Sequence, residues 1–284
     1  MTGKVIFIGA GPGAADLITL RGARLLGIAD VVLFDALTDP ALRESAPTAR
    51  WIHVGKRGFA DSTGQAAINA LLVKHASTCQ VVVRLKGGDP SVFGRLEEEL
   101  QALMAAGISS EVVPGVTAAM AAAASSQRPL TRRGHGRSVS LTTAMTNSGT
   151  SNASSSADTE VFYMAGKQLA ALSRRLLNAG WAADTAVSVV SRAGWLDQLQ
   201  SDHSAATLAQ ASMLHAGRPT VVTVGAGALP VVLEIGAETQ TTQASNPTPA
   251  EGQPQPLKCV MAAKSAQPAP TPASNQLLPS EPTS

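Results

Sequence analysis

From residue 5 to residue 125, short continuous apolar runs alternate with longer stretches in which apolar residues recur at helical spacing. Short continuous apolar runs are typical of strands that are buried on both faces. Strands that alternate with helices pair in parallel through right-handed crossovers, so we predict a parallel α/β sheet. The strands are predicted at residues 5–8, 31–34, 51–54, 81–85 and 111–113. The helices are predicted at residues 16–28, 65–75, 95–106 and 117–125.

A second block of strands and helices begins near Pro129. Between its first two strands, residues 147–158 are rich in Ser, Thr, Asn and Gly, which predicts a flexible loop. The same hydrophobic patterns predict strands and helices through the rest of the block. The strands are predicted at residues 139–143, 161–164, 186–191 and 220–225, and the helices at residues 168–179 and 207–215.

The composition changes sharply near residue 234. From there to the end, the chain is dominated by Pro, Ser, Thr, Gln and Ala. Such a segment cannot bury enough apolar surface to offset the entropy of ordering it. We therefore predict an N-terminal α/β domain over residues 1–114, a C-terminal α/β domain over residues 115–233 and a disordered tail over residues 234–284.

Length, charge and cysteine content exclude several function classes. The 284 residues suffice for one large or two ordinary domains, and the net charge of +2 is too small to indicate nucleic acid as a partner. Cys79 and Cys259 have no metal-binding or redox spacing, so no metal site is predicted. The N-terminus does not read as a signal peptide, and the longest low-charge stretch, residues 112–126, is too short to span a bilayer. We expect a cytoplasmic protein without a membrane partner.

Three glycine-rich turns follow apolar runs in the first half of the chain. They are residues 9–13 (GAGPG), 86–90 (KGGDP) and 113–118 (VPGVTA). Ligands of open α/β sheets bind at the carboxyl edge of the strands, and glycine lets the backbone approach a ligand closely. The three turns therefore predict a pocket that is built largely from bare backbone.

The first glycine turn permits two interpretations. Gly9, Gly11 and Ala14 fit a permissive dinucleotide fingerprint, and Asp35 ends the second strand where a ribose-binding carboxylate would lie. An NAD- or FAD-dependent oxidoreductase is therefore one alternative. Against it, Pro12 removes a backbone N–H that a pyrophosphate could use, and the other two glycine turns have no role in that fingerprint.

The order and spacing of seven motifs resemble the tetrapyrrole methylases, and among them most closely the uroporphyrinogen-III C-methyltransferases. The resemblance covers roughly residues 4–230, and the KGGDP turn is its most discriminating element. It implies a two-domain α/β fold with the active site in the interdomain cleft, and a homodimer. The motifs are GAGPG (9–13), DVVLFD (30–35), VGKR (54–57), VRLKGGDP (83–90), VFGR (92–95), VPGVTA (113–118) and VFYM (161–164).

The resemblance also implies a cofactor, S-adenosylmethionine. This cofactor carries no phosphate, so Pro12 is compatible with it, and its positive sulfonium suits carbonyl oxygens and dipoles. Carried over motif by motif, the implied contacts are Pro12, Gly87, Gly88, Asp89, Val92, Thr117, Ala118, Met164 and Ala193.

The implied reaction is C-methylation of uroporphyrinogen III to precorrin-2, the branch point toward siroheme and cobalamin. In the family, the residue matching Asp35 accepts a proton and the residue matching Lys56 donates one. A carboxylate can assist the proton loss that restores conjugation after methyl transfer. The substrate is rimmed by carboxylates, which arginine forks pair with well. The candidate substrate-binding residues are Arg21, Arg57, Arg95, Arg132 and Arg133.

Three segments depart from the family pattern. Residues 91–97 read SVFGRLE, where the family has an aromatic residue first and a glycine pair last. Residues 125–128 read SSQR in place of an aromatic-small-Gly-Ile stretch, and residues 191–193 read SRA in place of an acidic or polar residue followed by Asn-Gly. A methyltransferase that acts on a later corrinoid precursor and a non-catalytic tetrapyrrole carrier therefore remain as alternatives.

Overall fold

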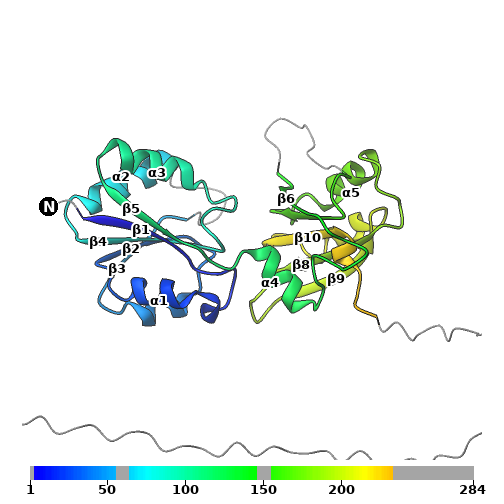
Figure 1. Ribbon diagram of the computed structural model, residues 1–284, viewed down its shortest axis with the longest axis horizontal. Helices are drawn as coiled ribbons and strands as arrows, with labels where there is room; N and C mark the ends of the chain where they lie inside the picture. Colours follow the sequence, from blue (N-terminus) through cyan, green and yellow to red (C-terminus); the bar gives the residue numbers. More distant parts are fainter. Residues whose placement is uncertain (1–2, 56–63, 146–154, 233–284) are drawn as a thin grey trace, which may run out of the picture. The chain divides into compact units, whose positions relative to one another are not determined.

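The first five strands of the computed structural model form the parallel sheet that the apolar runs predict (Figure 1). The structure describes residues 3–55, 64–145 and 155–232. The strand order is β3-β2-β4-β1-β5, and every neighbouring pair is parallel. β1 is an interior strand that pairs with β4 on one side and β5 on the other, and its residues are buried, which explains its continuous apolar sequence. The strands are β1 (Lys4–Gly9), β2 (Val31–Phe34), β3 (Arg50–His53), β4 (Val81–Lys86) and β5 (Ser109–Val113).

Helices cover both faces of this sheet (Figure 1). Successive residues of β1 point to opposite faces, so Val5 and Phe7 pack with α2 (Gln65–Ala76) and α3 (Leu96–Ala105). Ile6 and Ile8 pack on the other face with Leu26 of α1 (Leu20–Leu26).

The predicted helix over residues 16–28 is wrong at its start. The segment is a short 3₁₀ helix, η1 (Ala15–Leu17), followed by α1. Ile18 and Thr19 have extended backbone between the two, and the Thr19 hydroxyl accepts a hydrogen bond from the Gly22 N–H at 3.0 Å. This N-cap is the local signal that places the start of α1.

The second sheet is mixed, with the strand order β6-β7-β10-β8-β9. β6 and β7 are parallel, whereas the other neighbouring pairs are antiparallel. β9 has the polar sequence LQSDHS and was not predicted. The predicted helix over residues 207–215 is instead the 3₁₀ helix η3 (Leu208–Ser212). The strands are β6 (Val139–Thr143), β7 (Thr159–Tyr163), β8 (Ala186–Ser191), β9 (Leu199–Ser204) and β10 (Thr220–Gly225).

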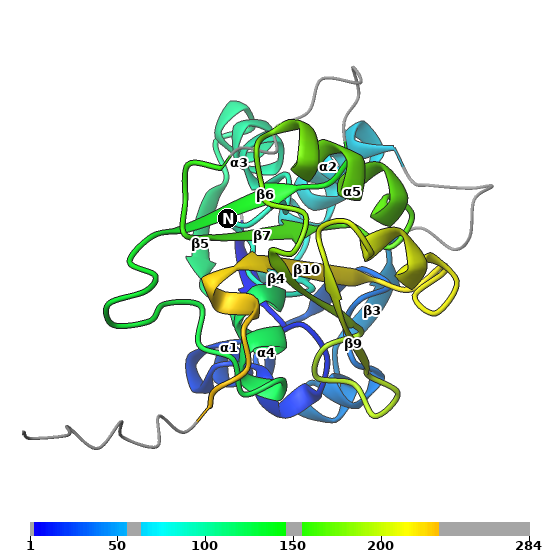
Figure 2. The ribbon, with the colours of Figure 1, turned by 90° about the vertical axis from the view of Figure 1, so that its right-hand side faces the viewer.

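Two helices pack on opposite faces of the second sheet (Figure 2). Leu169, Leu172 and Leu176 of α5 (Leu169–Asn178) share one core with Phe162. Small alanine side chains of α4 (Ala118–Ser125) contribute to the other core. Because an alanine stripe permits close approach, the start of α4 lies against Tyr163 at the end of β7.

Both sheets belong to one compact unit that ends near residue 233. The division into domains 1–114 and 115–233 stays a prediction. The predicted tail, most of the predicted loop over residues 147–158, and the candidates Lys56 and Arg57 lie outside the described residues. Among the helices that the structure describes, none has the length and apolar character needed to cross a membrane.

Candidate active site

The three glycine-rich turns meet at the carboxyl ends of β1, β4 and β5. Gly11 and Gly88 bind each other's backbone, with the Gly88 N–H donating to the Gly11 carbonyl at 2.7 Å. A Cβ added to Gly9 would lie 2.5 Å from the Gly115 Cα and 2.7 Å from the Gly88 carbonyl oxygen. Glycine is therefore required at Gly9, because the neighbouring turns approach too closely for a side chain.

A cavity of about 340 Å³ opens beside these turns, lined by residues from both sheets. The structure brings most of the predicted site residues to this one cavity. Arg21, Arg132 and Arg133 do not line it, and Lys56 and Arg57 are outside the described residues. The predicted residues that line the cavity are Pro12, Asp35, Gly87, Gly88, Asp89, Val92, Arg95, Thr117, Ala118, Met164 and Ala193.

Asp89 joins the second glycine turn to the third. Its Oδ1 accepts a hydrogen bond from the Ser91 N–H at 2.7 Å, and its Oδ2 accepts one from the Gly115 N–H at 2.9 Å. A carboxylate offers about four lone-pair sites. Asp89 therefore shapes the turn and still has acceptor capacity for a ligand in the cavity that it lines.

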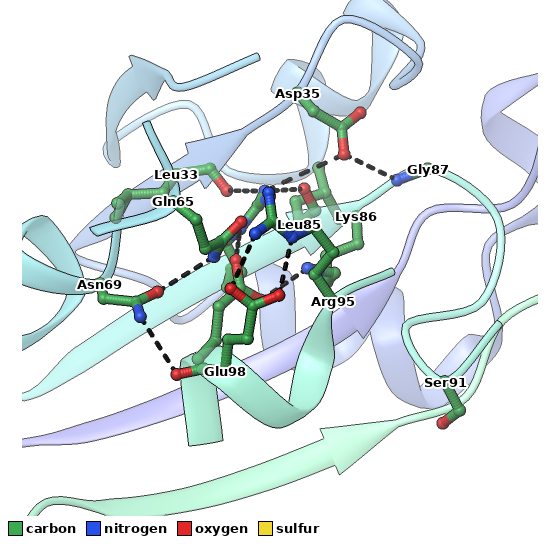
Figure 3. Close-up of polar contacts among 12 residues, drawn as sticks. Leu33, Asp35, Gln65, Asn69, Leu85, Lys86, Gly87, Ser91, Arg95 and Glu98 are labelled. Atoms are coloured by element: carbon green, nitrogen blue, oxygen red, sulfur yellow. Dashed lines mark hydrogen bonds and ion pairs between the residues drawn. The ribbon is translucent and has the colours of Figure 1, made fainter. Parts of the chain in front are cut away.

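Asp35 lies just beyond the end of β2, and its carboxylate is held from two sides (Figure 3). The Leu37 N–H donates to Oδ1 at 3.0 Å, and the Gly87 N–H donates to Oδ2 at 3.2 Å. The Arg84 guanidinium lies 4.0 Å from Oδ2. The carboxylate is thus fixed in place while it remains partly exposed to the cavity.

Arg84 also contacts a buried carboxylate, Glu99, which binds two buried cations. Glu99 Oε1 accepts from Arg84 Nε at 3.0 Å, and Oε2 accepts from Lys86 Nζ at 2.5 Å. Burial and the charge of Arg84 lower the pKa of Lys86, although Glu99 opposes this shift. Sequence reasoning missed this cluster; its signal is a pair of cations two residues apart, on one face of a buried strand.

Arg95 enters the cavity from the start of α3. Its guanidinium makes a two-pronged ion pair with Glu98, with both N–O distances at 2.8 Å (Figure 3). This pairing raises the pKa of Arg95. Arg95 and Phe93 both have positive φ, at 53° and 52°, so this segment turns tightly beside the cavity. The Phe93 ring packs against Tyr163, with ring centroids 5.0 Å apart.

A tyrosine of the second sheet binds the start of α4. The hydroxyls of Tyr163 and Thr117 are hydrogen-bonded at 2.8 Å, and the Ala119 N–H donates to the Tyr163 oxygen at 3.4 Å. Burial raises the pKa of Tyr163, so its hydroxyl is neutral at physiological pH. Sequence reasoning placed Thr117 and Met164 at the site but did not single out Tyr163, which lines the same cavity.

The loop after β8 closes another side of the cavity. The Trp195 indole N–H donates to the Pro12 carbonyl at 3.1 Å, and the Ala14 N–H donates to the Gly194 carbonyl at 2.9 Å. The Arg192 guanidinium lies 4.3 Å above the Trp195 ring, which is a favourable cation–π distance. The family motifs predicted only Ala193 here, from its spacing after β8, and gave no signal for the Arg192–Trp195 pairing.

The other described cations among the predicted site residues lie away from the cavity. Arg21 pairs with Glu111 at 2.5 Å on an exposed surface. Arg132 donates to the carbonyls of Leu229 and Pro230. Arg133 is exposed. Their substrate-binding role stays a prediction.

The cavity has the shape and chemistry for an organic cation. Gly88 has φ +74°, and a Cβ added there would find no described atom closer than the Thr117 Cα at 3.9 Å. A ligand can therefore occupy space that a side chain at Gly88 would fill. Asp89, Thr117 and Tyr163, whose side chains carry oxygen atoms, line the same cavity, and oxygen acceptors stabilise positive charge.

Comparisons with known proteins identify the family to which this chain belongs. The model of the family described as Tetrapyrrole (Corrin/Porphyrin) Methylases matches residues 4–209. A uroporphyrinogen-III C-methyltransferase of Pseudomonas aeruginosa is 45% identical over 197 residues, which cover 68% of this chain and 80% of that protein. A siroheme synthase of Baumannia cicadellinicola is 44% identical over 232 residues, which cover 78% of this chain. This chain spans about half the length of the siroheme synthases that it matches.

The fold is similar to that of a solved methyltransferase. The crystal structure of the uroporphyrin-III C-methyltransferase of Thermus thermophilus, complexed with S-adenosylhomocysteine, superposes with a TM-score of 0.69 at 33% identity. The match covers 78% of this chain and 97% of that chain. The α/β fold class and the family resemblance predicted from the motifs are confirmed, and the chain belongs to the tetrapyrrole methylase family.

Proposed function

We propose that this protein transfers methyl groups from S-adenosylmethionine to carbon atoms of uroporphyrinogen III, with precorrin-2 as the product. The main support is the cavity at which the three glycine turns, Asp35 and the loop after β8 meet. It occurs in a member of this family. The 45% identical relative from Pseudomonas aeruginosa bears the name of this activity. The product would feed siroheme or cobalamin synthesis.

The residues around Gly88 support the choice of cofactor. When bound, S-adenosylmethionine supplies an electrophilic methyl group on a positively charged sulfur. The open space at Gly88 and the oxygen atoms of Asp89, Thr117 and Tyr163 suit a cation without phosphate groups. The Thermus thermophilus relative was crystallised with the demethylated form of this cofactor. The proposed contacts are Pro12, Gly87, Gly88, Asp89, Val92, Thr117, Ala118, Met164 and Ala193.

Asp35 is the proposed proton acceptor. When a pyrrole carbon gains a methyl group, the macrocycle must lose a proton to restore conjugation, and a fixed carboxylate can accept it. Two backbone N–H groups and Arg84 hold the Asp35 carboxylate at the edge of the cavity, so it is oriented before substrate arrives. Lys56 is the proposed proton donor.

The cationic residues are proposed to bind the substrate carboxylates. Arg95 lines the cavity, and its bidentate pair with Glu98 fixes the plane of the guanidinium. A fixed guanidinium loses little entropy when it binds a further carboxylate. We propose the same role for Arg21, Arg57, Arg132 and Arg133. We further propose that the protein is cytoplasmic and that it forms a homodimer, the assembly that is usual in the family that its motifs resemble.

Incubation of the purified protein with uroporphyrinogen III and methyl-labelled S-adenosylmethionine tests the function. We expect label in the macrocycle and release of S-adenosylhomocysteine. An Asp35→Asn variant should bind S-adenosylhomocysteine as the wild type does but turn over more slowly, because Asn cannot accept a proton. Binding of the cofactor without labelling of uroporphyrinogen III would favour a later corrinoid precursor as substrate. Binding of the tetrapyrrole without any transfer would favour a carrier, and binding of NAD alone would favour an oxidoreductase.

A further inference from the structure

A chain of hydroxyl and imidazole groups lies behind the cavity wall in the second sheet. Thr220, which lines the cavity, is hydrogen-bonded to the Ser191 hydroxyl at 2.8 Å. Ser191 Oγ lies 2.6 Å from His215 Nδ1, and His215 Nε2 lies 2.8 Å from Ser201 Oγ. Ser201 Oγ is also 2.8 Å from His203 Nε2. The central members, Ser191 and His215, are fully buried.

The hydrogen bonds of this chain have a determined direction. The Thr220 hydroxyl donates its only proton to the Arg218 carbonyl at 2.8 Å. The Ser191 hydroxyl must therefore donate to Thr220. The Ser191 hydroxyl then has no second proton to donate to His215. Ser191 therefore accepts a hydrogen bond from His215, which places the imidazole proton on Nδ1.

The neutral state of His215 sets the direction of the remaining hydrogen bonds. Burial lowers the pKa of His215, and the charges of His203 and Arg218 lower it further. A neutral imidazole has one N–H, so with the proton on Nδ1 the Nε2 atom accepts from the Ser201 hydroxyl. Ser201 in turn accepts from the His203 Nε2–H. The three hydroxyl groups, the His215 Nδ1–H and the His203 Nε2–H then each have an acceptor.

The Ser191–Thr220 end of this hydrogen-bonded series lies next to a wall of the cavity. Ser191 and Thr220 are opposite partners in the β8–β10 register. Ser191 is followed by Arg192, whose N–H donates to the Pro219 carbonyl at 2.8 Å and whose φ is +52°. A non-glycine residue holds this backbone conformation only where its surroundings impose it. Arg192, Ala193 and Trp195 then form the wall.

The direction of these hydrogen bonds indicates that the hydrogen-bonded groups support the cavity wall and do not transport protons. All donors point from His203 toward Thr220, and the last proton goes to a backbone carbonyl, which cannot pass it on. The groups are thus locked in one pattern.

We propose that His215 is a positioning residue for the cavity: as the neutral Nδ1–H tautomer it holds Ser191 and Thr220, and through them the wall formed by Arg192, Ala193 and Trp195. The inference deepens the proposed function, since its consequence for affinity rests on S-adenosylmethionine binding in that cavity. The relevant contacts are all within the described residues of the second sheet and its loops.

The tautomer is tested directly by long-range ¹H–¹⁵N correlation of the imidazoles in the full chain at pH 7.5. We expect a protonated Nδ1 and an unprotonated Nε2 for His215, assigned by loss of the signals in His215→Asn. A His215 ring that carries its proton on Nε2, or that exchanges between both tautomers, would overturn the proposal.

The position of the wall is tested by the indole N–H resonance of Trp195, assigned with Trp195→Phe. We expect His215→Leu to move this resonance and His215→Asn to leave it close to its wild-type position, because the Asn amide places an N–H where Nδ1 was. His75→Leu is the matched control, since His75 is also buried but lies on α2 and does not line the cavity. A Trp195 resonance that responds equally to His75→Leu and His215→Leu would contradict a positioning role, and this readout needs no ligand.

Affinity for S-adenosylhomocysteine, measured by isothermal titration, completes the test. We expect a Kd about tenfold higher in His215→Leu, a Kd within about threefold of wild type in His215→Asn, and no change in His75→Leu. If His215→Leu does not fold, Ser201→Ala removes the donor to Nε2 and should also raise the Kd. Wild-type affinity in both variants would overturn the inference. Failure of the wild type itself to bind would count against the proposed function instead, and the two resonance measurements would still decide the positioning role.

Discussion

Trp195 and Pro12 are 183 positions apart in the chain, and the indole N–H of Trp195 donates to the Pro12 carbonyl at 3.1 Å. This bond joins the glycine turn after β1 to the loop after β8. The Ala14 N–H bond to the Gly194 carbonyl runs beside it at 2.9 Å. Two cavity walls that come from different sheets are therefore tied together at this contact.

Trp195→Phe keeps an aromatic ring in the wall but removes the N–H, which leaves the Pro12 carbonyl without this donor. The net value of such a hydrogen bond is about 0.5–1.5 kcal/mol. We expect the Kd for S-adenosylhomocysteine, measured by isothermal titration, to rise by the factor that corresponds to this loss of free energy. Trp51→Phe is the matched control, because the Trp51 indole also donates to a carbonyl, that of Ala46, at 3.1 Å and does not line the cavity. Equal effects of the two variants on affinity would contradict a binding role for the Trp195 contact.

Asp89→Ala should weaken binding of S-adenosylhomocysteine by about 1–3 kcal/mol, because it removes a cavity acceptor and leaves two backbone N–H groups without their partner. Those groups belong to Ser91 and Gly115. Asp39 offers a close control, since its carboxylate also accepts from two backbone N–H groups, those of Ala41 and Ala15, and does not line the cavity. We expect Asp39→Ala to lower the unfolding temperature with little change in affinity. Asp89→Ala with wild-type affinity would remove Asp89 from the proposed site.

The first sheet could be predicted from the sequence because each of its central strands is buried on both faces. Residues 5–8 and 81–85 are apolar or nearly so for that reason. The glycine turns could be assigned to one edge because parallel strands end at the same edge. β9 could not be predicted, since it is an edge strand with alternating exposed residues and a polar sequence.

The side-chain clusters depend on packing that no local pattern encodes. Arg84 and Glu99 are 15 positions apart, and they meet only because α3 packs over β4. His215 and Ser191 are 24 positions apart and belong to a loop and a strand. The family motifs named residues that line the cavity, but they gave no signal for the buried groups that hold those residues in place.

Glu99→Gln should lower the free energy of unfolding by about 3–5 kcal/mol, because it leaves two buried cations without their shared counter-charge. Both Arg84 and Lys86 bind the Glu99 carboxylate, which is fully buried. Chemical denaturation of the full chain measures this loss. Glu98→Gln is the control on the same helix; its ion pair with Arg95 is exposed, so water screens it and stability should change little. Equal losses of unfolding free energy in the two variants would show that burial of the Glu99 cluster adds nothing to stability.

The stability of the protein should fall as the pH drops below about 6.5, and buried histidines are the cause. Burial lowers the pKa of both His215 and His75 below the ordinary value of 6.5, and nearby cations add to each shift. Between the native pKa and 6.5 the unfolded chain binds more protons at these histidines than the native chain does. Their contribution to the free energy of unfolding therefore rises with pH in this window and levels off above it.

The carboxylates affect the free energy of unfolding in a separate, more acidic pH range. Arg128 lowers the pKa of Asp202 below 3.8, so the stability that this pair contributes is lost only in stronger acid. Denaturant unfolding at pH 7.5 and at pH 5.5 therefore isolates the histidines. We expect the difference between the two pH values to shrink in His215→Asn, and to shrink further when His75→Asn is added. Since His215 is fully buried with both ring nitrogens hydrogen-bonded, it should account for the larger part. A difference that survives both substitutions would place the loss of stability on other groups.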